Sequence, residues 1–136
     1  MPPVSDYTVQ NLKEVEDSAP KFGYAPQLEA RFAGPALGTE RSGLSYQRLA
    51  PGFRMPFGHS HAEQEEVYVI VSGTARAKVG EDIVELVQWD ALRVPREVMR
   101  AFEGGPNGCE LLAFGAPAGG ASASADAEMT PGWWAD

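Results

Sequence analysis

The 136-residue sequence predicts an all-β domain, an antiparallel barrel or sandwich of short strands, and three observations support this prediction. Fifteen glycines and eleven prolines supply turn formers at a density typical of many short strands. Apolar and β-branched runs of about five residues recur roughly every 8 to 12 residues, as in β-sandwiches and barrels. Helical patterns of roughly 10 to 15 residues do not alternate with these runs, which argues against a parallel α/β sheet.

The N-terminal extension, residues 1–27, is polar and rich in proline. A short helical stretch is expected within 10–18, with Asn11 as its cap and with Leu12 and Val15 facing inward. Pro20 and Pro26 should prevent a longer helix. The barrel itself is expected over residues 28–115, with strands at 28–33, 43–50, 67–71, 74–79, 83–87, 91–94, 98–103 and 110–114.

Two further regions follow the strands. Residues 116–127 are nearly all Ala, Gly and Ser, the composition of a flexible linker. The C-terminal tail, residues 128–136, contains Trp133 and Trp134 side by side. Two adjacent tryptophans need burial, so we expect them to dock on this barrel or on a partner subunit; the alternative is a ligand lid or a partner hook.

Charge and cysteine content exclude several classes of protein. With 11 basic and 19 acidic residues the net charge is −8, which argues against nucleic-acid binding and against binding to a membrane surface. No apolar run approaches the roughly 18 residues of a membrane-spanning helix, and residues 1–6 lack the pattern of a signal peptide. Cys109 is the single cysteine and is expected as a small core residue. Because one cysteine cannot form an internal disulfide, we expect a cytoplasmic protein in a reducing compartment.

The two histidines of the sequence, His59 and His61, are separated by one residue. On a β-strand, residues i and i+2 point to the same face, so both imidazoles would converge on one point. Glu66 follows five residues after His61 and adds a carboxylate. Two histidines and one carboxylate leave coordination positions open, as in non-haem Fe(II) sites, and Mn, Zn, Ni or Cu would also fit.

At this point the sequence resembles the cupin family. His59, His61, Glu66 and Gly73 match the family's first motif, and the distance to Gly73 selects Glu66 over Glu65, while the leading Gly52 is one residue too distant. Residues 90–102 resemble the second motif in length and in their Asp, Pro and aromatic positions. Two positions depart from it: Glu97 stands where a glycine is expected, and Arg100 stands where the third metal histidine is expected.

The resemblance covers roughly residues 43–115. It implies a cupin-type antiparallel β-barrel, a double-stranded β-helix or jelly roll, with a pocket at one mouth and short N-terminal and C-terminal extensions. It also implies a metal site at His59, His61 and Glu66, and a homodimer formed through the sheets. The alternative for the histidines is a lost metal site that now forms hydrogen bonds in a polar pocket, and the alternative for Glu66 is an acid at a strand edge.

Arg100 leaves three possibilities open. A guanidinium has no lone pair for a metal, so Arg100 could turn aside from a three-ligand metal and bind a carboxylate or phosphate of the ligand. It could instead pair with Glu66 and convert the metal site into a salt bridge. With a shift of one residue in register, it would lie on the outer surface.

The remaining candidates follow from strand alternation. Tyr68 and Ile70 share parity with Glu66 and should line the interior, whereas the valines between them should face a second sheet or subunit. Tyr68, Arg48 and Phe102 are candidate ligand-binding residues, as is Tyr46, although an ordinary structural role competes for Arg48, Tyr46 and Phe102.

Three functions therefore remain open. The first is a small cupin with a divalent transition metal at His59, His61 and Glu66 that binds a small anionic organic ligand with the help of Arg100. Isomerisation, lyase chemistry and dioxygenation all occur in the family, and no motif in the sequence selects among them. The second is a metal-free binding or sensing module that uses Arg100 and the histidines. The third is a structural dimeric barrel.

Overall fold

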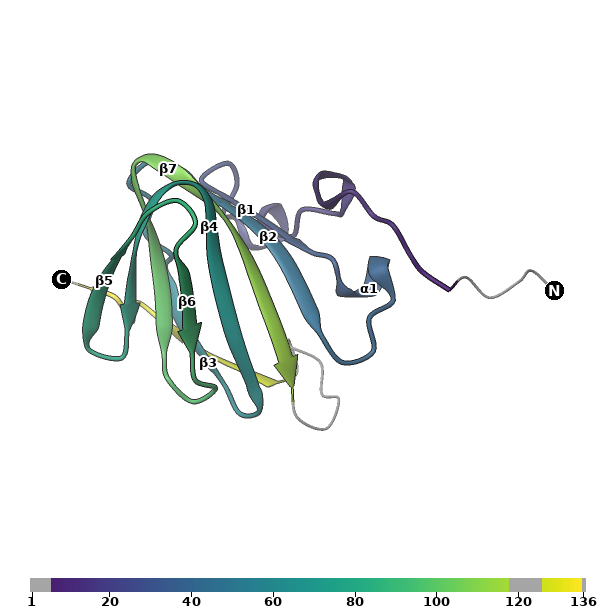
Figure 1. The fold of residues 1–136 in the computed structure, drawn as a ribbon. Helices are drawn as coiled ribbons and strands as arrows, with labels where there is room; N and C mark the ends of the chain where they lie inside the picture. Colours follow the sequence, from purple (N-terminus) through teal and green to yellow (C-terminus); the bar gives the residue numbers. More distant parts are fainter. Residues whose placement is uncertain (1–5, 118–125, 136) are drawn as a thin grey trace.

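The computed structural model describes residues 6–117 and 126–135, in which eight strands form one curled antiparallel sheet (Figure 1). This is the all-β barrel that the sequence predicts. No helix in the described residues is long and apolar enough to cross a membrane. The strands are β1 (Leu28–Phe32), β2 (Gly43–Leu49), β3 (Phe57–His61), β4 (Gln64–Val79), β5 (Asp82–Leu86), β6 (Ala91–Val94), β7 (Arg100–Pro117) and β8 (Ala127–Pro131).

The two longest strands, β4 and β7, pair with each other and connect the sheet. One path runs β1-β2-β7-β3-β8, and β4 also pairs with β5 and β6. Each long strand joins two strands that the sequence predicts separately. Their pairing shifts register at Val71 and at Thr74, and such bulges let a strand bend without ending. Gly73 lies in this bend with φ of 71°, and a Cβ there would lie 2.1 Å from the Gly108 carbonyl oxygen.

Alternation along β4 confirms the predicted inner and outer faces. Glu66, Tyr68 and Ile70 are buried, while the valines between them are half-buried. Cys109 is a buried core residue, as expected, and burial raises the pKa of its thiol to about 11. Within the main hydrophobic cluster, the most completely buried residues come from β2, β4, β6 and β7: Leu49, Ile70, Ala77, Val94, Ala101, Phe102 and Leu111.

The N-terminal segment contains the expected helical turn in a shortened form. A 3₁₀ turn, η1, spans Leu12–Glu14, and the side chain of Asn11 caps it by accepting a hydrogen bond from the Lys13 backbone N–H. Val15 is buried and Leu12 is half-buried. Two further short elements, η2 (Ala19–Phe22) and α1 (Gly34–Leu37), begin with a proline in the first turn, where its missing N–H costs nothing.

The C-terminal segment contains a strand that the sequence analysis does not predict. β8 pairs antiparallel with β3, from Phe57 opposite Pro131 to His61 opposite Ala127. Beyond it Trp134 is 5 % exposed and joins the core of this same chain, and Trp133 packs partly buried against that core. Most of the expected linker, residues 118–125, lies outside the described residues.

Candidate metal centre

The side chains of His59 and His61 lie on the same side of β3 and converge on Glu66 of β4. His59 Nε2 lies 3.2 Å from Glu66 Oε1, and His61 Nε2 lies 3.0 Å from the same oxygen. Among the described residues these three form a group whose candidate ligand atoms lie within 4.8 Å of one another. The i and i+2 spacing on an extended strand accounts for the shared side, as the sequence analysis expects.

The geometry of this group fits a divalent transition metal. Two ligand atoms at right angles, each about 2.1 Å from an ion, lie about 3 Å apart, which matches both nitrogen-to-oxygen distances. Glu66 Oε1 carries a lone pair, and each histidine Nε2 presents one when the ring proton is on Nδ1. The group is well enclosed, since the side chains of His61, Glu66 and His59 are 4 %, 11 % and 21 % exposed. His59 is therefore the member most open to solvent.

Glu66 is also the centre of a buried hydrogen-bond network. The Tyr68 hydroxyl donates to Glu66 Oε1 at 2.6 Å, and Gln64 Nε2 donates to Oε2 at 3.1 Å. Although burial opposes ionisation, the hydrogen bonds from His59, His61 and Tyr68 hold the pKa of Glu66 well below its usual range. Burial, together with the Glu66 charge, raises the pKa of Tyr68 well above its usual value. A carboxylate charge at the centre of the group therefore persists at neutral pH.

Arg100 lies inside the barrel next to this carboxylate. It is 0 % exposed, with Nη1 3.5 Å from Glu66 Oε1 and with Nη2 donating to the Pro95 carbonyl oxygen at 2.9 Å. This placement excludes the alternative in which Arg100 lies on the outer surface. Within the described part of the chain, Nε has no hydrogen-bond partner. The guanidinium thus lies beside the His59–His61–Glu66 group, as the resemblance to the family's second motif implies.

Two other candidates, Arg48 and Phe102, do not contact Glu66 directly. Arg48 points away from the interior, because it alternates with the buried Leu49, and its guanidinium binds Glu29 and the Pro26 carbonyl oxygen. The structure therefore does not bring Arg48 to the His59–His61–Glu66 group. Phe102 is fully buried, with its ring centroid 4.6 Å from that of Tyr68. It packs against the Tyr68 ring and so helps to hold the Tyr68 hydroxyl that donates to Glu66.

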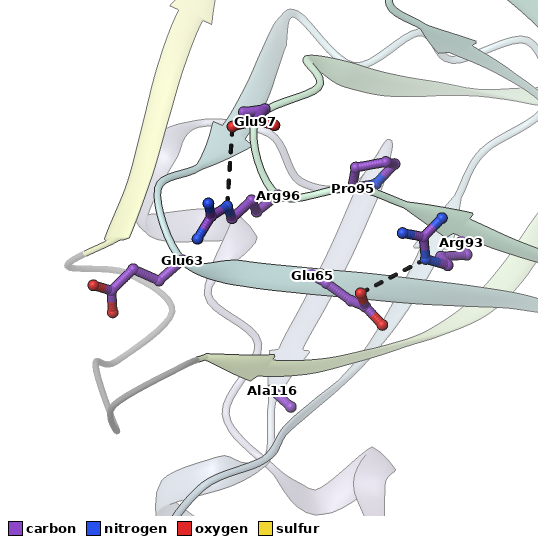
Figure 2. A pocket seen from close by; sticks show the side chains of 7 residues that line it. All are labelled: Glu63, Glu65, Arg93, Pro95, Arg96, Glu97 and Ala116. Atoms are coloured by element: carbon purple, nitrogen blue, oxygen red, sulfur yellow. Dashed lines mark ion pairs between the residues drawn. The ribbon is translucent and has the colours of Figure 1, made fainter.

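The surface depressions beside this group are separate from it. One of about 430 Å³, shown in Figure 2, is lined by charged side chains, among them Glu65 and Arg93, which lie 3.6 Å apart. A second, of about 400 Å³, lies on the outer face at Leu44, Val67 and Phe114. Neither is lined by His59, His61 or Glu66, which are enclosed by the strands.

Sequence reasoning missed two residues of the site, Gln64 and Asp126. Gln64 holds the second oxygen of Glu66. Asp126 Oδ2 lies 3.4 Å from His61 Nδ1. Although burial opposes ionisation, hydrogen bonds from the backbone N–H groups of residues 62–64 lower the pKa of Asp126. One signal was present: Asp126 is the single charged residue among the small residues of 116–127.

Comparisons with known proteins give the fold. No family model matches the chain, and no curated protein matches it. A cupin protein from Bacteroides fragilis is similar in structure, with a TM-score of 0.70, 21 % identity, and 88 % of this chain and 91 % of that chain covered. Oxalate decarboxylase from Bacillus subtilis at pH 4.6 is also similar, with a TM-score of 0.76, 17 % identity, and 94 % and 33 % covered.

A third similar structure is described as that of DMSP lyases, with a TM-score of 0.64, 20 % identity, and 76 % of this chain and 52 % of that chain covered. This chain therefore spans about a third of oxalate decarboxylase and about half of the lyase structure. The curled antiparallel sheet, the His-x-His strand and these three likenesses agree, and the chain has the cupin fold.

Proposed function

We propose that this chain is a small cupin that binds one divalent transition metal through His59 Nε2, His61 Nε2 and Glu66 Oε1. The observation that carries the proposal is the convergence of these three lone-pair atoms, with nitrogen-to-oxygen distances of 3.0 and 3.2 Å. When bound, the ion supplies Lewis acidity or redox chemistry. Tyr68 and Gln64 hold the carboxylate, so that the ligand atoms are oriented before an ion arrives.

The ligand we propose for this site is a small organic anion. Arg100 is a permanent cation with no access to solvent, and its Nε has no hydrogen-bond partner among the described residues. A guanidinium binds carboxylates through two parallel hydrogen bonds, the strong arrangement for this pair. The likeness to oxalate decarboxylase supports the same chemistry, because oxalate is a small dicarboxylate. The ligand's acid group would face Arg100 beside the open coordination positions.

Metal binding is testable with purified protein and a single variant. The protein, stripped with a chelator and titrated with Mn²⁺ or Zn²⁺ in a calorimeter, should bind about one ion per chain. His61→Ala removes one ligand atom, so the affinity should fall at least about 100-fold, beyond the effect of losing an outer partner. Glu85→Gln, on the exposed side of β5, should bind like the unmodified protein. A protein that takes up neither ion would contradict the proposal.

A second candidate, metal-free anion binding, is favoured by one observation. Arg100 Nη1 lies 3.5 Å from Glu66 Oε1, so cation and carboxylate already face each other without an ion. In that case the stripped protein would bind oxalate as tightly as the metal-loaded protein does. Metal-dependent oxalate binding would favour the first function.

We also propose that two copies of the chain pair through the outer face of the sheet. Leu44, Phe114 and Val67 stand in one cross-strand row on that face, and Phe114 is 42 % exposed. Covering this row with a second copy should bury more than about 1,000 Å² in total. Light scattering should then report about twice the 14.6 kDa chain mass. Phe114→Glu should give a monomer, Ile83→Glu on the exposed part of β5 should not, and a monomeric unmodified protein would refute the pairing.

A further inference from the structure

The imidazole of His61 lies between two carboxylates. Its Nε2 is 3.0 Å from Glu66 Oε1, and its Nδ1 is 3.4 Å from Asp126 Oδ2. The side chains of His61 and Asp126 are 4 % and 3 % exposed, so solvent has little access to the Nδ1 side of the ring. Both ring nitrogens therefore face an acid oxygen, one from the metal-ligating group and one from the C-terminal segment.

The carboxylate of Asp126 is fixed by the turn between β3 and β4. Oδ1 accepts hydrogen bonds from the backbone N–H groups of Ala62 and Glu63, both at 2.9 Å. Oδ2 accepts from the N–H groups of Glu63 at 3.1 Å and Gln64 at 2.8 Å. Because this turn directly follows His61, the same contacts set the position of Oδ2 relative to the ring.

We propose that Asp126 is a positioning residue that acts through His61 on the metal site, and this inference rests on the proposed metal binding. A neutral histidine whose Nε2 lone pair binds an ion carries its proton on Nδ1. His61 Nδ1 is buried and has no hydrogen-bond partner among the described residues, and Asp126 Oδ2, 3.4 Å away, is placed to accept that proton. Metal-binding histidines generally donate the second ring N–H to such a partner, which fixes both the tautomer and the ring orientation.

The C-terminal segment brings Asp126 to this position. Asp126 comes immediately before β8, which pairs with all of β3 from Phe57 to His61. On its other side β3 has a single residue pair with β7, His59 opposite Arg100. The strand that carries both histidines is therefore aligned mainly by β8, and the segment that aligns it also carries the partner of His61.

The experiment compares Mn²⁺ and Zn²⁺ affinities of variants that differ at Asp126. Asp126→Asn keeps the shape but places an amide N–H₂ or a neutral oxygen beside Nδ1, so the affinity should fall about 10- to 100-fold. Asp126→Ser can still cap the turn but is too short to reach His61, and it should lose affinity to a similar extent. Glu128→Gln, exposed on β8 of the same segment, is the matched control and should bind like the unmodified protein.

A second readout separates positioning from mere stabilisation of the fold. In the Zn²⁺-loaded protein, ¹⁵N NMR should show a slowly exchanging Nδ1 proton on His61, and Asp126→Ser should make it exchange fast or remove it. Affinities within twofold of the unmodified protein for both Asp126 variants would overturn the inference and leave the metal proposal standing. An unmodified protein that binds no ion would overturn both.

Discussion

The segments at the two ends of the described chain, residues 6–27 and 126–135, are attached to the barrel in different ways. Residues 6–27 contact β2 and β7 through the exposed Lys13 side chain, and they bury only the small side chains of Val15 and Ala19. Residues 126–135 instead complete the edge of the sheet, supply a carboxylate to the candidate metal centre, and bury Trp134 in the core. The tryptophan pair predicts the burial of the C-terminal segment, whereas the pairing of this segment with β3 and the contact of Asp126 with His61 follow only from the fold.

Lys13 of the N-terminal segment contacts Glu110, a carboxylate that also holds two side chains of the sheet. The hydroxyls of Tyr46 and Ser72 donate to Glu110, and Lys13 lies 3.3 Å from Glu110 Oε2. The Lys13 side chain remains 57 % exposed, so solvent screens its attraction to Glu110. Ion pairs of this exposure contribute little, about 0 to 1 kcal/mol.

At the C-terminal end, apolar burial dominates. The Trp134 ring packs with the core cluster, and the Arg54 guanidinium lies 4.4 Å from its centroid. The ring of Trp133 lies so close to Gly58 that a Cβ there would meet it at 2.6 Å. Gly58 is thus required for β3 to lie beneath this tail. Such burial outweighs the exposed polar contacts of the other end.

The comparison predicts its largest effect at Trp134. Trp134→Ala should lower the free energy of unfolding by about 3 to 5 kcal/mol, because it leaves a cavity in the core. Trp89→Ala, which removes an exposed indole of 68 % accessibility, is the matched control and should change it by less than about 0.5 kcal/mol. Urea titration measures both. Equal effects for the two variants would mean that the tail does not stabilise the barrel.

A smaller, pH-dependent effect is expected at Glu110. Hydrogen bonds from Tyr46 and Ser72 lower the pKa of Glu110 to about 2 from its ordinary value of 4.5. A carboxyl with a depressed folded-state pKa stabilises fully above pH 4.5, and this contribution is lost as the pH falls from about 4.5 to about 2. Glu110→Gln should therefore be less stable than the unmodified protein at pH 7, and the difference should shrink towards pH 2.

Glu81→Gln, in the exposed turn before β5, is the control for this series. The test is the denaturant midpoint of the unmodified protein and of both variants at pH 7, 4 and 2.5. If the Glu110→Gln deficit stayed constant across this range, the N-terminal attachment would not depend on the Glu110 charge, and the contrast between the two ends would weaken.

The parts of the fold that depend on local pattern were predictable. The alternation from Glu66 to Ile70 gives the correct inner face, and the His-x-His spacing gives a shared side for both imidazoles. Strand limits in β1, β2, β5 and β6 differ from the predicted ones by about one residue or less. Short-range periodicity encodes these features directly.

The missing parts depend on contacts between distant residues. Nothing in Ala127–Pro131 is typical of a strand, and it is one because the edge of β3 offers unpaired backbone groups. Gln64 and Asp126 belong to the site through the fold, not through any motif. Arg48 faces away from the interior because it alternates with the buried Leu49 on β2. This alternation was available in the sequence but was applied only to β4.

The pairing of β3 with β8 also sets an order of events during synthesis. His59 and His61 leave the ribosome early, whereas Asp126 follows Ala62 by 64 residues. Until that segment emerges, the strand with both histidines has an unpaired edge, the kind of edge that other chains can add to. Pairing of β8 with β3 therefore competes with the pairing of β3 with strands of other chains. The same pairing brings Asp126 to His61.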